Sequence, residues 1–492
     1  MGTIGPTEQT PLFRVLNDRQ IEKLYHAALQ CLDRTGVNVL NAEARDLFAA
    51  AGSDVDGVRV RIPPFLVQEA VRIAPRSFTL WERPSGQDRA QDPGNCLHIT
   101  ADRVHYGPGP TCTYFVDPQT GKRRMTRRGD PGLTALVCDA LDQVDYVMSL
   151  GLISDVEPYL APVYEFAEMV AQTTKPVLPW AYTTQNVSDI YDIALAVAGS
   201  EQALRRRPFL ALFTTFQSPL ILTNGDMANA FWAAERGVPV VSLGGGTAGT
   251  TGPITGAGIM ALALAGALAS LTALQLKVPG AQVCIGSAPQ AMDLRSCRPA
   301  YGSPEMSLYC AGMSDVWRHL GVPFMGTGGA SEAKVVDLQA AIESTVQVVV
   351  SGLSGQPLVH DIGFLDCANI GSLEMLVMND EIIAMTRRIM RGVEVSDDTL
   401  MLDLIDEIGP GGEFISAIET ARRCRTEIWH PSLLDRDTWD VWQEAGSPTM
   451  QDRVRARVKK ILASHRPAPL PDGVAEEIDA LLEAAAQREQ AV

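Results

Sequence analysis

Seven short apolar runs recur along the middle of the chain, and polar residues gather between them. They are residues 144–153, 177–182, 209–216, 238–243, 282–285, 322–325 and 358–360. Strands buried on both faces of a parallel sheet are continuously apolar, and spacings of roughly 30 to 45 residues leave room for a crossover helix. The pattern therefore predicts repeated β/α units. An eighth strand, before residue 110 or at an edge, would complete a (β/α)8 TIM barrel.

The pattern changes on both sides of this core. Residues 12–50 show helical periodicity, and residues 78–117 alternate between apolar and polar positions with many turn residues. We therefore predict an N-terminal α+β appendage at 1–120 and the TIM-barrel core at 121–380. Amphipathic segments dominate afterwards, which predicts a C-terminal helical extension at 381–492.

Composition narrows the functional classes. The 492 residues are 46% hydrophobic and 20% charged, which is typical of a globular protein with a large core. There are 41 basic and 58 acidic residues, a net charge of −17. Such a charge repels nucleic acids and anionic membranes, so neither is expected as a partner, whereas a cationic substrate is attracted.

The cysteines and the start of the chain bear on location. Nine cysteines are scattered without a Cys-x-x-Cys pair, so neither a disulfide framework nor a zinc site is indicated, and we expect no metal. Residues 1–6 contain no cationic run before an apolar core. We therefore expect a cytoplasmic protein.

A segment without charge lies between Arg236 and Lys277 and is 40 residues long. Its length would allow a membrane span, but its many Ala, Gly, Thr and Ser residues favour a buried helix. A soluble chain must cover such a surface, either with its own amino-terminal appendage or with another subunit. We expect a homo-oligomer, most simply a dimer or a multiple of one, and substitution of Leu264 or Leu268 by Glu would test that surface.

The same region begins with three glycines, Gly244, Gly245 and Gly246, in a formal G-x-G-x-x-G. A dinucleotide site also needs an acidic residue about 20 positions later, and none occurs before Asp293. We interpret the glycines instead as backbone that approaches a ligand or cofactor closely at the barrel mouth.

The ends of the predicted strands supply the candidate site. Trp180, Tyr182, Phe213, Phe216, Glu305 and Lys334 are the predicted substrate-binding residues, and Asp337, His360 and Asp361 are the predicted catalytic residues. Aromatic rings with carboxylates suit a quaternary ammonium group, which cannot donate hydrogen bonds and is held by cation–π attraction and charge.

Two pairs of these candidate residues could have either a structural or a functional role. Lys334 and Asp337 are three residues apart and could pair in the first turn of a helix. A structural ion pair and a functional pair are equal alternatives. His360 and Asp361 stand at a strand end, where at least one side chain must face the barrel axis, although a structural histidine is an equal alternative.

Several motifs together resemble the trimethylamine methyltransferase superfamily. They are Gly-Ala-Ser-Glu-Ala-Lys334-Val-Val-Asp337-Leu-Gln339, His360-Asp361-Ile-Gly363, Ser372-Leu-Glu-Met-Leu376, Gly409-Pro-Gly-Gly412 and Glu427-Ile-Trp-His-Pro431. The chain has no pyrrolysine and so resembles the branch that includes glycine betaine methyltransferase.

The resemblance implies the same barrel and a methyl transfer from a quaternary or tertiary methylamine to the Co(I) of a corrinoid. Because the chain contains no Asp-x-His-x-x-Gly motif, cobalamin would arrive on a separate corrinoid protein and would not be bound permanently. A quaternary ammonium already carries a neutral leaving amine, so the protein must mainly orient and desolvate it.

Two alternatives stay open. The chain departs from the family pattern at Glu332, Ala341 and Cys424, where Asp, Gly and His are usual, so it could bind a methylamine without transferring its methyl group. Lys334 could instead serve a Schiff-base aldolase, although the neighbouring Asp337 would keep its amine charged.

Overall fold

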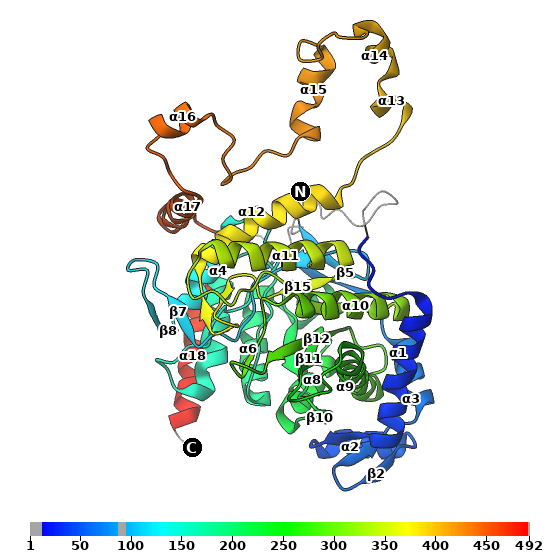
Figure 1. Cartoon of the computed structure of the whole chain (residues 1–492). Helices are drawn as coiled ribbons and strands as arrows, with labels where there is room; N and C mark the ends of the chain where they lie inside the picture. The colour runs from blue at the N-terminus through cyan, green and yellow to red at the C-terminus, as the bar shows by residue number, and fades with distance from the viewer. Residues whose placement is uncertain (1–11, 87–94, 491–492) are drawn as a thin grey trace.

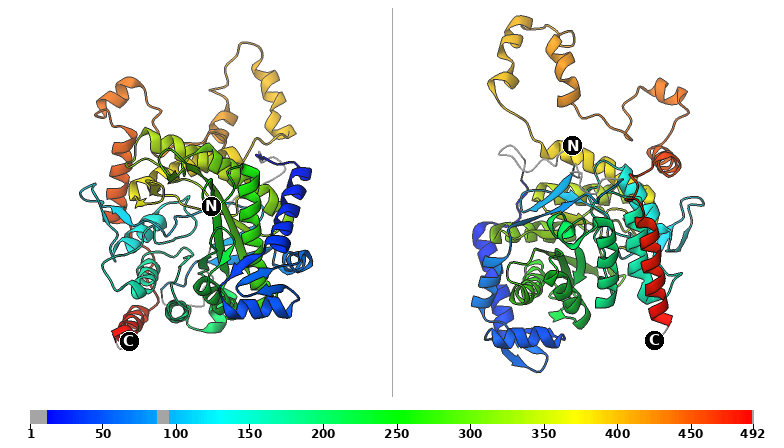
Figure 2. Two further views of the ribbon diagram at one scale, coloured as in Figure 1. Left: turned by 60° about the horizontal axis from the view of Figure 1, so that its bottom comes forward. Right: turned by 180° about the vertical axis from the view of Figure 1, so that it is seen from behind.

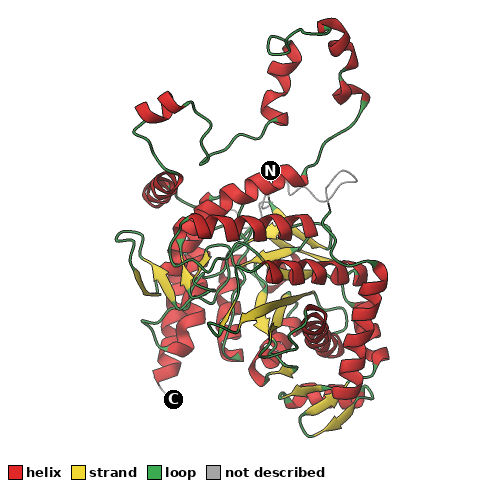
Figure 3. Cartoon of the chain, viewed as in Figure 1, coloured by secondary structure: helices red, strands yellow, loops and turns green. Residues whose placement is uncertain are grey.

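The structure is a computed structural model that describes residues 12–86 and 95–490. Six parallel strands form its central sheet in the order β6-β15-β14-β12-β11-β9. They are β6 (His105–Tyr106), β9 (Leu212–Thr215), β11 (Val240–Ala248), β12 (Val283–Asp293), β14 (Phe324–Thr327) and β15 (Leu358–His360). β13 (Arg298–Pro299) pairs with the extended end of β12. Figure 3 shows these strands enclosed by helices.

Two further segments link the edges of this sheet. The backbone N–H of Asp145 donates to the carbonyl of Tyr106 on β6 at 2.8 Å. Val147 pairs in parallel with Val177, and Val177 pairs with Leu210 just before β9. The sheet therefore curls into a TIM-barrel-like ring, and the strand expected before residue 110 is β6, inside the range predicted for the appendage.

A helix follows each of the eight segments. The helices are α4 (Asp130–Ala140), α5 (Ala161–Gln172), α6 (Thr184–Ala198), α8 (Asn224–Glu235), α9 (Gly256–Lys277), α10 (Pro304–Leu320), α11 (Leu338–Ser354) and α12 (Leu373–Met390). The short α7 (Glu201–Arg206) follows α6. In Figure 1, α10, α11 and α12 lie over the strands.

Helix α9 is the charge-free segment. Within the described part of the chain it alone is long and apolar enough to cross a membrane, and 78% of its most apolar window is buried inside the protein. Helices α1 (Asp18–Gln30), α2 (Ala42–Ala50) and α3 (Pro64–Ile73) pack against it. Leu264 and Leu268 are fully buried. The covering surface thus comes from the same chain, and these two leucines are not available to another subunit.

Three smaller sheets of the described residues lie outside the central sheet. One contains β10 (Ile221–Leu222), β1 (Val37–Val39), β3 (Arg59–Arg61) and β2 (Asp54–Asp56), and another contains β16 (Phe364–Leu365), β17 (Ile370–Gly371), β7 (Tyr114–Val116) and β8 (Arg123–Met125). The hairpin of β4 (Ser77–Trp81) and β5 (Cys96–Thr100) has a different role. Its Phe78, Leu80 and Ile99 belong to the same apolar cluster as the barrel interior. Because Trp81 N–H donates to the carbonyl of Pro208, ahead of β9, the hairpin closes the amino-terminal end of the barrel.

The carboxyl-terminal part is helical. It comprises α13 (Asp397–Leu400), α14 (Leu402–Ile408), α15 (Ile418–Glu427), α16 (Trp439–Glu444), α17 (Met450–Ser464) and α18 (Val474–Gln490). Helix α18 packs along α5 and α6 (Figure 2). Helices α13 to α16 instead stand away from the barrel on extended connections (Figure 1).

Candidate functional site

His360 and Asp361 meet at the carboxyl end of β15. Leu358 lies in the interior cluster, so alternation along the strand directs His360 into the barrel as well. Asp361 has a φ of 82°, which turns its side chain back toward the same site. Its carboxylate accepts hydrogen bonds from His360 Nδ1 and, at 2.5 Å, from Thr327 Oγ1. Both residues therefore contribute to one site at the mouth.

The other ring nitrogen of His360 is available for a ligand. A carboxylate can only accept, so Nδ1 carries the proton and Nε2 offers a lone pair. Nε2 is buried and has no hydrogen-bond partner among the described residues. The Phe213 ring stands edge-on to the imidazole, with centroids 6.4 Å apart. A buried polar atom without a protein partner needs a water, an ion or a ligand, so Nε2 is a candidate ligand contact.

An aromatic cluster forms the opposite part of the mouth. Trp180 packs against the interior cluster that contains Phe213. The Trp180 and Tyr182 rings are perpendicular at 4.5 Å, and Tyr159 meets Tyr182 at 6.4 Å. Tyr182 remains about half exposed. These rings offer π faces to a cation that enters from solvent.

Glu165 lies beneath these rings and was missed by sequence reasoning. It projects from α5, where its carboxylate accepts hydrogen bonds from Trp180 Nε1 at 2.7 Å and from the N–H of Ile153 at 3.0 Å. Burial raises its pKa to about 7, although these hydrogen bonds act against the rise. In the sequence, Glu165 is one of many acidic residues in a predicted crossover segment. Only its burial, which the sequence does not reveal, distinguishes it from solvent-exposed acidic residues.

Two glycines, Gly107 and Gly109, and Tyr301 lie on the remaining side of the site. A Cβ at Gly107 would overlap the Tyr146 ring, and one at Gly109 would stand 2.6 Å from Asp361 Oδ1. Tyr301, from the loop after β13, lies within reach of the charge on this carboxylate. Burial raises the pKa of Tyr301 well above its usual value, and the charge of Asp361 raises it further.

Several predicted residues lie apart from this site. Phe216 packs behind the sheet against Gly244 and Gly266. Glu305 is exposed in the first turn of α10. Asp337 caps α11 by accepting from the N–H of Ala340, so it does not pair with Lys334.

Lys334 instead belongs to a surface contact. It precedes α11, is largely exposed, and lies 3.7 Å from Asp366, which also pairs with Arg298 at 2.8 Å. Arg298 lies on β13, Lys334 in the loop after β14 and Asp366 directly after β16. Lys334 therefore holds loops together around the mouth.

The three glycines of β11 do not form a turn. They pair in register with Ser287, Ala288 and Pro289 of β12. A Cβ at Gly245 would stand 2.3 Å from the carbonyl oxygen of Ala288, and one at Gly244 would overlap Phe216. Neighbouring protein atoms therefore leave no room for a side chain at these positions.

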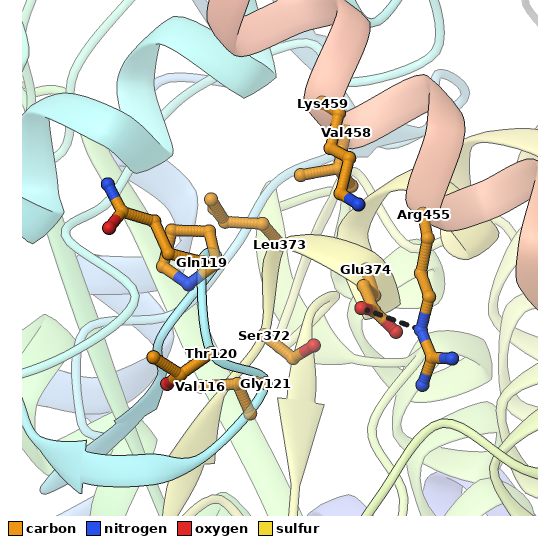
Figure 4. A pocket seen from close by; sticks show the side chains of 11 residues that line it. Val116, Gln119, Thr120, Gly121, Ser372, Leu373, Glu374, Arg455, Val458 and Lys459 are labelled. Atoms are coloured by element: carbon orange, nitrogen blue, oxygen red, sulfur yellow. Dashed lines mark hydrogen bonds and ion pairs between the residues drawn. The ribbon is translucent and has the colours of Figure 1, made fainter.

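A cavity of about 350 Å³ lies outside the barrel axis (Figure 4). It is bounded by the loop after β7, the start of α12 and α17, and Arg455 lies 3.3 Å from Glu374 across it. Among residues 12–86 and 95–490, His, Cys, Asp and Glu side chains form no group of three that could hold a metal ion.

Comparison with known proteins adds to this geometry. The profile of the family described as Trimethylamine methyltransferase (MTTB) matches residues 3–491. The chain belongs to the trimethylamine methyltransferase family. This membership makes it a methyltransferase.

Individual relatives of this trimethylamine methyltransferase family member cover nearly its whole length. It is 29% identical to trimethylamine methyltransferase MttB of Desulfitobacterium hafniense, over 95% of this chain and 93% of that protein. It is 28% identical to glycine betaine methyltransferase of the same species, over 96% of both chains.

A solved structure agrees with the fold. The monomethylamine methyltransferase MtmB of Methanosarcina barkeri superposes with a TM-score of 0.51, over 92% of this chain and 89% of that one, at 12% identity. The likeness extends to the α/β TIM-barrel-like architecture.

Proposed function

We propose that this protein transfers a methyl group from a quaternary or tertiary methylamine, such as a betaine, to the corrinoid of a separate protein. The observation that carries the proposal is the buried, unpartnered Nε2 of His360 in an aromatic and apolar barrel mouth. The relatives that carry the names trimethylamine and glycine betaine methyltransferase support the substrate class. The full proposed architecture is a closed (β/α)8 barrel with the terminal additions described above.

Substrate capture is assigned to the aromatic cluster. A methylated ammonium would lie against Trp180 and Tyr182, with the ionised Glu165 carboxylate beneath them as its counter-charge. Each such cation–π contact contributes about 1 to 2 kcal/mol once water is displaced. These contacts fix the position of the nitrogen and leave its methyl groups directed into the barrel.

The His360–Asp361 pair would orient the reacting methyl group. Nε2 presents a lone pair, so a protonated tertiary amine would donate its N–H there, whereas a quaternary amine would place polarised methyl C–H groups against it. Asp361 and Thr327 hold the imidazole in this orientation. Phe213 and the interior side chains exclude water from the transfer.

The methyl acceptor is a partner-borne co-substrate in this proposal. A corrinoid supplies a Co(I) nucleophile strong enough to displace a neutral amine from carbon. The chain's contribution is an open mouth, because Tyr182 and Tyr159 are exposed at its rim. The proposed setting is cytoplasmic.

The test uses purified protein, free cob(I)alamin as the acceptor, and a panel of betaines and methylamines. We expect a methylcobalamin absorbance spectrum with at least one substrate, and we expect Trp180→Leu to raise KM for that substrate at least tenfold. No spectral change across the panel with either cob(I)alamin or a reduced corrinoid protein would contradict the proposal.

No observation specifically favours either of the two alternative functions. Glu332 lies in the loop after β14, where its carboxylate accepts a hydrogen bond from Gly302 N–H, so a carboxylate is kept at this position. Ala341 is partly buried on α11 and packs against the core, and Cys424 is exposed on α15. Lys334 is exposed and ion-paired, whereas a Schiff-base lysine needs a desolvated amine. Calorimetric betaine binding without turnover would favour a binding protein.

A further inference from the structure

The segment between α12 and α17 contains an outer lobe, residues 393–428, that leaves many apolar side chains exposed. Its helices α13, α14 and α15 contain no buried residue in the described structure. Val393, Leu402, Ile415 and Ile418 are all exposed, Ile415 at 80%. Helices of this length are marginal in water by themselves, so these need apolar contacts from another surface.

The lobe has a shape suited to receive side chains. A largely apolar cavity of about 500 Å³ opens on it, and its lining includes Leu400, Leu404, Phe414, Cys424 and Ile428. A cavity of this size admits several branched aliphatic side chains. The lobe is therefore an apolar cup on a projecting support.

The same chain exposes a matching ridge on α11. Leu338, Ile342 and Val346 follow one another at intervals of four residues, and Leu338 is 83% exposed. Glu343 is the only charged residue of this helix, and it turns inward to accept from Ser331 Oγ. An exposed apolar helix face without an outward charge is a candidate interaction surface.

The base of the lobe is attached to α12. Glu381 accepts hydrogen bonds from the backbone N–H groups of Ser432, Leu433 and Leu434, and Arg388 donates to the carbonyl of Glu427. The lobe therefore projects outward from α12 (Figures 1 and 2). The cup and the ridge of one chain stay separate.

The position of the lobe also decides between partners. Helix α12 begins at the mouth and runs back to the closed end, where its Arg387 binds Asp145 at the start of a barrel segment. The lobe follows that far end of α12. A methyl-accepting protein must approach the opposite end, so the lobe is suited to a different partner.

We propose that the outer lobe of one copy of this chain covers the α11 ridge of a second copy, with the exchange made reciprocally. At the observed exposures, lobe and ridge together offer on the order of 1,000 Å² of apolar surface per copy, whereas a stable interface needs roughly 800 Å² per partner. A two-fold axis satisfies both surfaces at once. This proposal is independent of the methyl-transfer proposal.

The first experiment is crosslinking through the natural Cys424, which is exposed in the cup. A short bismaleimide should join Ile342→Cys chains into covalent dimers, and the added Cys424→Ser change should remove at least nine-tenths of them. Glu477→Cys, on the exposed side of α18, is the matched control and should give no more dimer than wild type.

The second experiment measures mass by light scattering. Wild type should be at least twice 53.0 kDa, and either Ile342→Glu or Ile418→Glu should reduce the mass. A mixture of these two variants should recover dimers, because one cup and one ridge remain intact. Both side chains are exposed, so circular dichroism should show unchanged folding.

Three outcomes would overturn the proposal. A Cys424-dependent crosslink inside a 53.0 kDa monomer would mean that the lobe closes on its own ridge. A dimer that survives both Glu substitutions would place the interface elsewhere. A monomer that forms a complex through the lobe only when a corrinoid protein is added would assign the cup to that protein.

Discussion

Two buried carboxyl groups, Glu165 and Asp380, show what environment does to single residues. Burial raises their pKa values from 4.5 to about 7 and from 3.8 to about 6. A group whose pKa is higher in the folded than in the unfolded state stabilises the fold fully below its unfolded pKa. That contribution is lost as the pH rises through the folded value.

We therefore expect the free energy of unfolding to fall between pH 4.5 and 7, by on the order of 3 kcal/mol from Glu165 alone. Glu165→Gln should flatten this slope, and Asp380→Asn should flatten its lower part, between pH 4 and 6. Urea unfolding at intervals of half a pH unit measures both.

The same carboxyl makes a prediction about binding. A quaternary ammonium favours ionised Glu165, so its affinity should rise as the pH increases through about 7. Glu165→Gln should lower the affinity about tenfold at pH 8 and remove the pH dependence. Calorimetry with glycine betaine, which has no titrating nitrogen, provides the measurement, and unchanged dependence in the variant would contradict this role.

The Asp361–His360 pair can be probed by graded substitutions. Asp361→Asn should lower kcat about 100-fold, because an amide no longer requires the proton on His360 Nδ1. Thr327→Val removes one hydrogen bond to Asp361 and should cost about tenfold. Methyl transfer to cob(I)alamin is the assay, and equal losses in both variants would speak against an orienting chain of hydrogen bonds.

At the scale of elements, the close approach of β11 and β12 controls the barrel wall. Nine consecutive residues pair from Val240 with Val283 to Ala248 with Ala291. The glycines of β11 remove side chains where backbone and Phe216 press against the strand. A motif that resembles a nucleotide loop thus has a packing function here.

Gly245→Ala should destabilise the fold by about 1 to 3 kcal/mol, because its Cβ would meet the carbonyl oxygen of Ala288 at 2.3 Å. Gly129→Ala is the control, since no atom lies within 4 Å of a Cβ there and its φ is −74°. Thermal unfolding compares the two. Equal stability would mean that the strands separate at little cost.

At the scale of the whole molecule, Arg83 joins distant parts of the chain. It follows β4 and donates to the carbonyls of Val170 and Thr173 near the end of α5 and of Ala468 before α18. It is almost fully buried, and burial lowers its pKa to about 10, so it stays charged at neutral pH. Arg83 therefore ties the hairpin that closes the barrel to α5 and to the segment before α18.

Arg83→Met should destabilise the protein by about 3 kcal/mol, because buried carbonyls lose a charged donor. It should also release the carboxyl-terminal residues to proteolysis. Arg466→Met, an exposed change in the same linker, should do neither. Limited trypsin digestion followed by mass spectrometry distinguishes local release from global unfolding.

Sequence reasoning located much of the barrel but less of its mouth. The positions of β9, β14 and β15 follow from apolar runs, because strands covered on both faces exclude polar residues locally. His360 and Asp361 were recognisable because they end such a strand. Glu165 and Tyr301 were not, since a helix and a loop carry them and their burial depends on residues far along the chain.

What the sequence by itself determined is the order of β and α elements, the family and the strand-end pair His360–Asp361, because these depend on local periodicity and contiguous motifs. Tertiary structure alone decided that α1 to α3 cover α9, that Asp337 serves as a helix cap, and that the outer lobe projects without cover. Each of these depends on which surfaces meet in space. An apolar stretch in the sequence indicates that its surface must be covered. Which surface covers it is decided only when the chain has folded.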